Sequence, residues 1–110
     1  MKFRSLTPAI AVFMCAVSAA NAAESETELV KISGCSACHD INAKLVGPSW
    51  KDIAARYRND PNAKTVLMAK VRNGSRGAWT DVTGGIPMPP YSQRVSDADI
   101  EKLIDYILGL

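Results

Sequence analysis

Three residues that could bind a cofactor covalently and ligate a metal lie close together: Cys35, Cys38 and His39. Residues three positions apart lie on one face of a helical turn, so the two thiols can bond to the same edge of a flat ligand. His39, the only histidine of the chain, can ligate iron through a neutral ring nitrogen. This C-x-x-C-H spacing is typical of the attachment site of a c-type haem. We therefore expect one haem c per chain, bound covalently through Cys35 and Cys38, with His39 as an axial ligand.

Three other kinds of site use a cysteine pair, and the sequence favours each of them less. A structural zinc site needs about four Cys or His ligands, and no second Cys or His pair follows this one. A thioredoxin-like redox pair expects a preceding strand in a βαβ unit, whereas the patterns here are helical. A disulfide between Cys35 and Cys38 would close a loop too short to restrict the unfolded chain much, and it would give His39 no role.

A second axial ligand is expected in the segment from Gly74 to Tyr91, which is rich in glycine and proline and has no sustained hydrophobic period. Such a segment is long for an idle loop in a small domain. Met88 lies near its centre between Pro87 and Pro89, whose fixed φ angles stiffen the chain. A neutral thioether favours ferrous iron, so Met88 is the predicted second ligand and would raise the reduction potential.

Met68 is the alternative sulfur ligand, but its position between Leu67 and Ala69 on a predicted helix favours a role in core packing. With His39 and Met88 both bound, the iron would have no open position for catalysis. This predicts a carrier of single electrons and not an enzyme. Two alternatives stay open: a ligand sensor or enzyme with a labile or absent Met88 bond, and a haem-bearing subunit of a larger oxidoreductase.

The first 22 residues have the features of a secretory signal peptide. A positive start is followed by an apolar stretch over residues 9–17 and by the small residues Ala20-Asn21-Ala22, so we expect cleavage after Ala22 or Ala23. Residues 23–110 would then form one periplasmic domain. An uncleaved signal that tethers the protein to a membrane is the alternative.

The apparent positive charge of the chain belongs to this signal. Removing Lys2 and Arg4 lowers the basic count from 13 to 11, equal to the 11 acidic residues, and Cys15 would be removed as well. No cluster of basic residues predicts a nucleic-acid partner, and no later apolar run of roughly eighteen residues predicts a membrane span. A chain this short is marginally stable without a covalent or metal staple, so we expect it to be largely unfolded without haem.

Two amphipathic helices are predicted near the two ends of the mature chain. The first is expected to start at Ser25, which forms a capping box with Glu28, and to end at Gly34. The last begins after Ser96, with Asp99 three residues later, and its apolar period should pack across the first helix. The apolar positions of that last helix are Ile100, Leu103, Ile104, Ile107 and Leu108.

Two further helices are predicted between them. Pro48-Ser49 opens one, and Asp60-Pro61 opens the other, which should end at Asn73-Gly74. Each carries an apolar stripe at helical spacing that should face the core. The stripes comprise Trp50, Ile53, Ala54 and Tyr57, and Ala63, Val66, Leu67 and Val71.

The chain resembles the short-chain bacterial class I cytochromes c over nearly all of its mature length. The resemblance is carried by Cys35 to His39, Leu45-Val46-Gly47-Pro48, Asn73-Gly74, Trp79 and Ile86-Pro87-Met88-Pro89-Pro90. It implies an all-α fold in which the helices wrap one haem and the N- and C-terminal helices cross. It also implies a monomeric periplasmic carrier that docks transiently, with a quinol-oxidising membrane complex as electron donor and a nitrite reductase or terminal oxidase as acceptor.

The same resemblance assigns roles to two residues near the cofactor. The carbonyl of Pro48 would accept a hydrogen bond from the second ring nitrogen of His39, which fixes the ring of a ligating imidazole. The indole N–H of Trp79 would reach a haem propionate, although Trp79 could also be a core aromatic.

Three features depart from the family pattern. Lys70 replaces an arginine that binds a propionate in some relatives, and a lysine cannot make the planar two-pronged contact. Tyr91 replaces an asparagine that bonds the methionine ligand. The stretch from Thr80 to Gly85 is longer than in the shortest relatives, which could change the exposure of the haem edge near the methionine.

Overall fold

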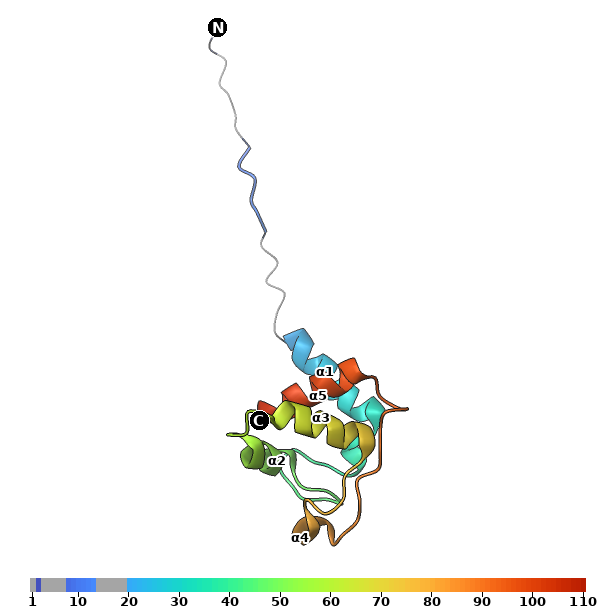
Figure 1. Cartoon of the computed structure of the whole chain (residues 1–110). Helices are drawn as coiled ribbons and strands as arrows, with labels where there is room; N and C mark the ends of the chain where they lie inside the picture. The colour runs from blue at the N-terminus through green and yellow to red at the C-terminus, as the bar shows by residue number, and fades with distance from the viewer. Residues whose placement is uncertain (1, 3–7, 14–19) are drawn as a thin grey trace.

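The computed structural model describes residues 2, 8–13 and 20–110, and within these residues it is helical with one isolated β-bridge. The predicted all-α class is confirmed. Figure 1 shows the helices gathered into one body, with residues 8–13 lying well away from it. No helix in the described part of the chain is long and apolar enough to cross a membrane. In chain order the elements are α1 (Ala20–Ser33), the 3-10 turn η1 (Cys35–Ala37), α2 (Trp50–Tyr57), α3 (Ala63–Asn73), α4 (Thr80–Thr83) and α5 (Asp97–Leu108).

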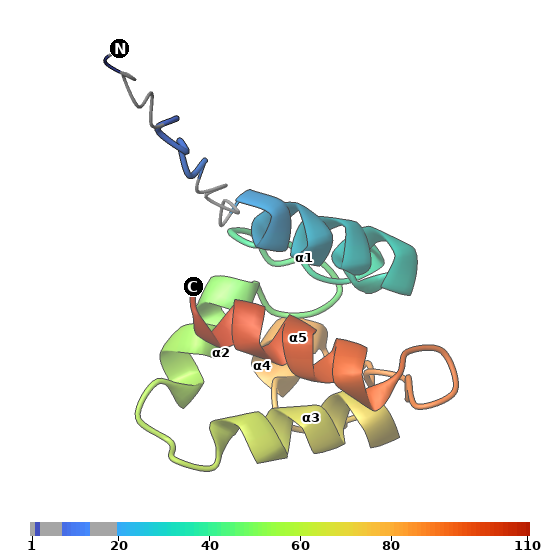
Figure 2. The same cartoon turned by 90° about the horizontal axis from the view of Figure 1, so that it is seen from above.

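Helix α5 is the centre of the fold because it contacts α1, α2 and α3. Figure 2 shows it between α1 and α3, so the first and last helices pack together as predicted. It begins where predicted, since the Ser96 side chain accepts a hydrogen bond from the backbone N–H of Asp99 at 3.2 Å. Helix α2 begins in the same way, with Ser49 accepting from the N–H of Asp52 at 3.1 Å.

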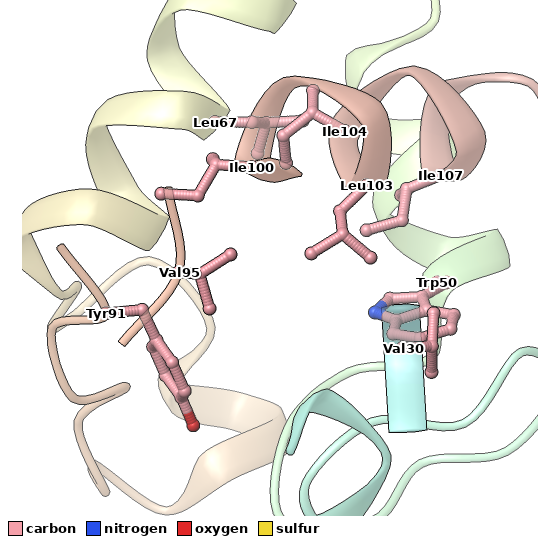
Figure 3. Packing of buried hydrophobic residues seen from close by; sticks show 9 residues of the cluster. All are labelled: Val30, Trp50, Leu67, Tyr91, Val95, Ile100, Leu103, Ile104 and Ile107. Carbon is pink, nitrogen blue, oxygen red and sulfur yellow. The ribbon is translucent and has the colours of Figure 1, made fainter. Parts of the chain in front are cut away.

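The core forms around the apolar face of α5. Ile100 is 0% exposed and Ile104 2%, and Leu103 and Ile107 are also buried. In Figure 3 the side chains of Leu103 and Ile107 point toward Trp50 of α2 and Val30 of α1. The predicted stripes of the middle helices therefore face the core, and the buried members of the cluster are Val30, Trp50, Leu67, Tyr91, Val95, Ile100, Leu103, Ile104 and Ile107.

Three ion pairs among the described residues join α3 to α5 on the surface. The Lys64 ammonium lies 2.7 Å from a carboxylate oxygen of Glu101 and 3.1 Å from one of Asp105. The Arg72 Nε lies 2.8 Å from the Asp97 carboxylate. Exposed pairs of this kind contribute little stability, so the apolar contacts dominate this interface.

Two predicted helix starts are wrong. Helix α1 begins at Ala20 and not at Ser25, because the alanines that precede Ser25 have high helix propensity and extend the helix. Helix α3 begins at Ala63, because Asp60 caps a separate turn: its carboxylate accepts from the N–H of Asn62 and its carbonyl from the N–H of Ala63.

Part of the predicted signal peptide lies outside the described residues. This applies to Arg4, to Cys15 and to the second half of the apolar stretch over residues 9–17.

Candidate cofactor site

One cavity brings together every site residue predicted from the sequence. Its empty space is about 1180 Å³, which includes the part open to solvent. Leu103, Ile104 and Ile107 of α5 give it an apolar back wall. The predicted residues that line it are Cys35, Cys38, His39, Pro48, Lys70, Trp79, Met88 and Tyr91.

His39 is held in the tautomer that a metal ligand needs. Its Nδ1 lies 2.8 Å from the carbonyl oxygen of Pro48, so the hydrogen bond predicted between them is present. Because a carbonyl can only accept, Nδ1 carries the proton and Nε2 keeps its lone pair. Burial lowers the pKa of His39, and the bond to Pro48 offsets this only in part. The imidazole is therefore favoured in its neutral form, which is the form that binds metal ions.

The ring of His39 is also fixed by close packing on both sides of Pro48. A Cβ added to Gly47 would lie 2.6 Å from Cε1 of His39, so only glycine leaves room for the imidazole. On the other side, the indole of Trp50 stacks at an interplanar angle of 21° with 6.1 Å between ring centroids. Trp50 itself packs edge-on against Tyr106 of α5.

Cys35 begins the tight turn η1 and Cys38 follows its last residue; the turn comes directly after the positive-φ residue Gly34 that ends α1. The carbonyl of Cys35 accepts hydrogen bonds from the backbone N–H groups of Cys38 and His39 at 3.2 and 3.0 Å. Both thiols are free and half-buried at the cavity wall. The local backbone therefore brings both thiols and the imidazole to one wall, as the addition of two thiols to one porphyrin edge requires.

Met88 also lines the cavity and is held there by an antiparallel bridge to Ser75. The N–H of Met88 donates to the carbonyl of Ser75 at 2.8 Å, and the N–H of Ser75 donates to the carbonyl of Met88 at 3.0 Å. Gly74 permits this approach, since its φ is +83° and an added Cβ would lie 2.8 Å from the Met88 carbonyl oxygen. Beyond the prolines, the N–H of Tyr91 donates to the carbonyl of Val71 at 3.0 Å. The methionine segment is thus fastened at Met88 to Ser75, just beyond α3, and at Tyr91 to α3 itself.

Trp79 lines the cavity and directly precedes α4, a short helix that the sequence analysis did not predict. The guanidinium carbon of Arg56 lies 4.4 Å from the centre of the Trp79 ring, and Nη1 of Arg56 donates to the carbonyl of Ala78 at 2.6 Å. The predicted contact of the indole with a propionate stays a prediction.

The two residues that depart from the family pattern both line the cavity. Lys70 Nζ lies 3.4 Å from Oγ of Ser75, which directs its ammonium toward the methionine segment. Tyr91 is 8% exposed and belongs to the core cluster.

Sequence analysis missed four residues that shape this site: Gly47, Trp50 as a partner of His39, Ser75 and Arg56. Gly47 directly precedes Pro48, the predicted acceptor, and this position could have indicated its close packing against His39. No local pattern connects Met88 to Ser75 or Arg56 to Trp79, because these contacts join segments far apart in the sequence.

The cytochrome c family model matches residues 27–110 of this chain. The chain is 45% identical to cytochrome c-552 of Nitrosomonas europaea over 95 residues, which cover 86% of this chain and 87% of that protein. It is 44% identical to cytochrome c-551 of Allochromatium vinosum over 95 residues, covering 86% and 96% of the two chains. The crystal structure of wild-type Nitrosomonas europaea cytochrome c552 superimposes with a TM-score of 0.69 at 48% identity and covers 76% of this chain and 98% of that one.

Proposed function

Because this chain belongs to the cytochrome c family, we propose that it is a periplasmic electron carrier whose haem iron is bound by His39 and Met88. Its cofactor is one haem c, attached covalently through Cys35 and Cys38. When bound, haem supplies an iron that cycles between the ferrous and ferric states and so accepts and releases one electron at a time.

The observation that carries this proposal is the pairing of two separately fixed ligands on one cavity. The bond to Pro48 and the packing of Gly47 hold His39 with Nε2 unprotonated. The bridge to Ser75 holds Met88 on the same cavity. Both side chains are neutral; the ring of His39 is fixed by its own contacts, and the backbone of Met88 is fixed by its bridge to Ser75. Two rigid ligands suit electron transfer, because little has to move when the iron changes its charge.

The apolar walls support the same conclusion. The α5 side chains, together with Ile53 and Leu67, exclude water from the back of the cavity. Burial of this kind disfavours the more highly charged ferric state and so raises the reduction potential. If His39 and Met88 both bind the iron, it would have no open position at which to carry out catalysis.

We further propose that residues 1–22 are a signal peptide and that residues 23–110 are the mature monomeric domain. Its partners would be a quinol-oxidising complex as donor and a nitrite reductase or terminal oxidase as acceptor. Val46 and Ile86 line the cavity yet are 47% and 59% exposed, and Leu45 beside them is 46% exposed. Small apolar surfaces of this kind suit brief docking of a redox partner.

Absorption spectroscopy of the purified protein tests the ligand assignment. We expect a low-spin ferric spectrum with the weak long-wavelength sulfur-to-iron band, and no change when carbon monoxide is added after reduction. A high-spin spectrum with ready carbon monoxide binding would exclude Met88 as a stable ligand and favour a ligand sensor.

The mass of protein isolated from the periplasm tests the remaining parts of the proposal. A mass equal to residues 23–110 plus one haem supports both cleavage and covalent attachment. A mass that includes residues 1–22 would contradict cleavage, and elution as part of a larger complex would favour a subunit of an oxidoreductase.

A further inference from the structure

Arg56 lies in the last turn of α2 and does not line the cofactor cavity, yet it contacts two consecutive residues of the cavity wall. Its Nη1 donates to the carbonyl of Ala78 at 2.6 Å, across 22 positions of sequence. Its guanidinium carbon lies 4.4 Å from the centre of the Trp79 ring. Within the part of the chain that the structure describes, no other hydrogen bond joins α2 to residues 74–91.

This pair of contacts depends on the planar shape of the guanidinium group. One face of the plane lies over the indole, where the ring electrons attract a cation, while an N–H at its edge donates to the carbonyl. A lysine carries the same charge as a single ammonium group and cannot present a flat face and an edge together. The shape of the side chain therefore contributes to the contact, in addition to its charge.

Fixing Trp79 also fixes the segment that follows it. The carbonyl of Trp79 accepts hydrogen bonds from the N–H groups of Val82 and Thr83 at 2.9 and 2.8 Å, and these bonds begin α4. Ala78, Trp79 and Thr83 all line the cavity. One guanidinium thus connects α2 to a wall that runs from Ala78 to Thr83.

We propose that Arg56 is a positioning residue that holds Trp79 and α4 against the cofactor and thereby keeps the reduction potential high. The inference rests on the proposed function in one respect, namely that haem occupies the cavity that Trp79 lines. Without the contact, this wall would loosen and admit water, which favours the ferric state and lowers the potential. Loss of the charge alone would lower the potential too, so the two causes have to be separated by experiment.

The test compares Arg56→Lys, which keeps the charge, with Arg56→Gln, which removes it, in the haem-loaded protein. The control is Arg58→Gln, because Arg58 is an exposed residue at the end of the same helix and has no hydrogen bond, ion pair or ring contact among the described residues. The readouts are the reduction potential and the hydrogen-exchange rates of the Val82 and Thr83 amides, which Arg56 does not touch.

We expect both Arg56 variants to show about tenfold faster exchange at these amides, the effect of losing one charge-assisted hydrogen bond and one cation–π contact, together with a lower potential. The Arg58 variant should match the parent in both. Exchange at the parental rate in both Arg56 variants would overturn the proposal, as would a parental potential in Arg56→Lys with a lowered one in Arg56→Gln, which would indicate charge alone. The absorption spectrum of the parent protein reports separately whether Met88 binds the iron. A failure of the proposed function can therefore be distinguished from a failure of the proposal for Arg56.

Discussion

The two sides of the cofactor cavity are held in different ways. On the histidine side, His39 is fixed by neighbours in sequence: Pro48 is nine positions away, and Gly47 and Trp50 flank that proline. On the methionine side, Met88 depends on Ser75, and the adjoining wall depends on Arg56, which lies 22 positions from its partner Ala78. The histidine side is therefore the more local structure, whereas the methionine side also depends on contacts from α2 and α3, namely from Arg56 to Ala78 and from Val71 to Tyr91.

The two sides also differ in burial. Gly47, Pro48, Ser49 and Trp50 are all buried, whereas the residues around Met88 are mostly exposed; His39 and Met88 themselves are both half-buried. Changes on the histidine side should therefore disturb the whole fold. Changes on the methionine side should loosen one ligand and leave the helices in place.

Removing the cofactor should have the largest effect, because it removes the contact that joins the two sides. We expect the Cys35→Ala/Cys38→Ala protein, prepared without haem, to be largely unfolded, since a small core offers little stability by itself. Circular dichroism and thermal melting measure this. Native-like helix content with a cooperative melt would show that the helices do not need the cofactor.

Replacing Met88 should affect the ligand without unfolding the chain. Met88→Ala should open one iron position, allow carbon monoxide to bind after reduction and lower the potential. The matched control is Met68→Ala, because Met68 packs beside the core on α3. It should cost about 2 kcal/mol of unfolding free energy and leave the spectrum unchanged. Carbon monoxide binding in Met68→Ala and not in Met88→Ala would reverse the ligand assignment.

Gly47→Ala tests the tight packing of the histidine side. The added Cβ would lie 2.6 Å from His39, so we expect a loss of about 1–3 kcal/mol in unfolding free energy and a changed spectrum. Gly109→Ala is the control, since its φ of −82° suits alanine and its Cβ would lie 3.4 Å from the nearest carbonyl oxygens. A parental denaturation curve for Gly47→Ala would mean that the histidine side tolerates movement.

Gly74→Ala applies the same change to the methionine side. Alanine there must adopt a φ of +83° and would place its Cβ 2.8 Å from the Met88 carbonyl oxygen. We expect a loss of about 1–2 kcal/mol, a weaker sulfur-to-iron band and an unchanged environment of His39 in proton NMR. Equal disturbance of His39 by both glycine variants would contradict the separation of the two sides.

Lys64→Ala gives the smallest expected effect, because Lys64 does not line the cavity that holds the two proposed ligands. Glu101 and Asp105 raise the pKa of Lys64 above its ordinary 10.5, so the folded state favours the charged amine. The stabilisation is complete below pH 10.5 and disappears as the pH rises through the raised pKa. The variant should melt slightly below the parent at neutral pH, and the difference should shrink at high salt and above that pKa. A difference that persists under both conditions would indicate lost packing.

The difference between local and long-range contacts also explains what could be predicted from the sequence. The period of α5 and the serine caps at Ser49 and Ser96 are local signals, so these helices begin where expected. The C-x-x-C-H spacing is local as well, and the family matches support the haem c that it predicts. The start of α1 was missed because alanines extend it. The bridge of Met88 and the hydrogen bond from Arg56 to the carbonyl of Ala78 could not be predicted, since every residue type offers the same backbone carbonyl.

The central place of α5 has a consequence for the order in which the molecule can form. The helix that contacts α1, α2 and α3 is the last of the helices along the chain. Until α5 has been synthesised, α1, α2 and α3 lack the apolar surface on which all of them pack. A chain that is made N-terminus first therefore cannot complete its core before α5 is present. During that interval both thiols are accessible to haem. The packing of α5 then buries the attached cofactor.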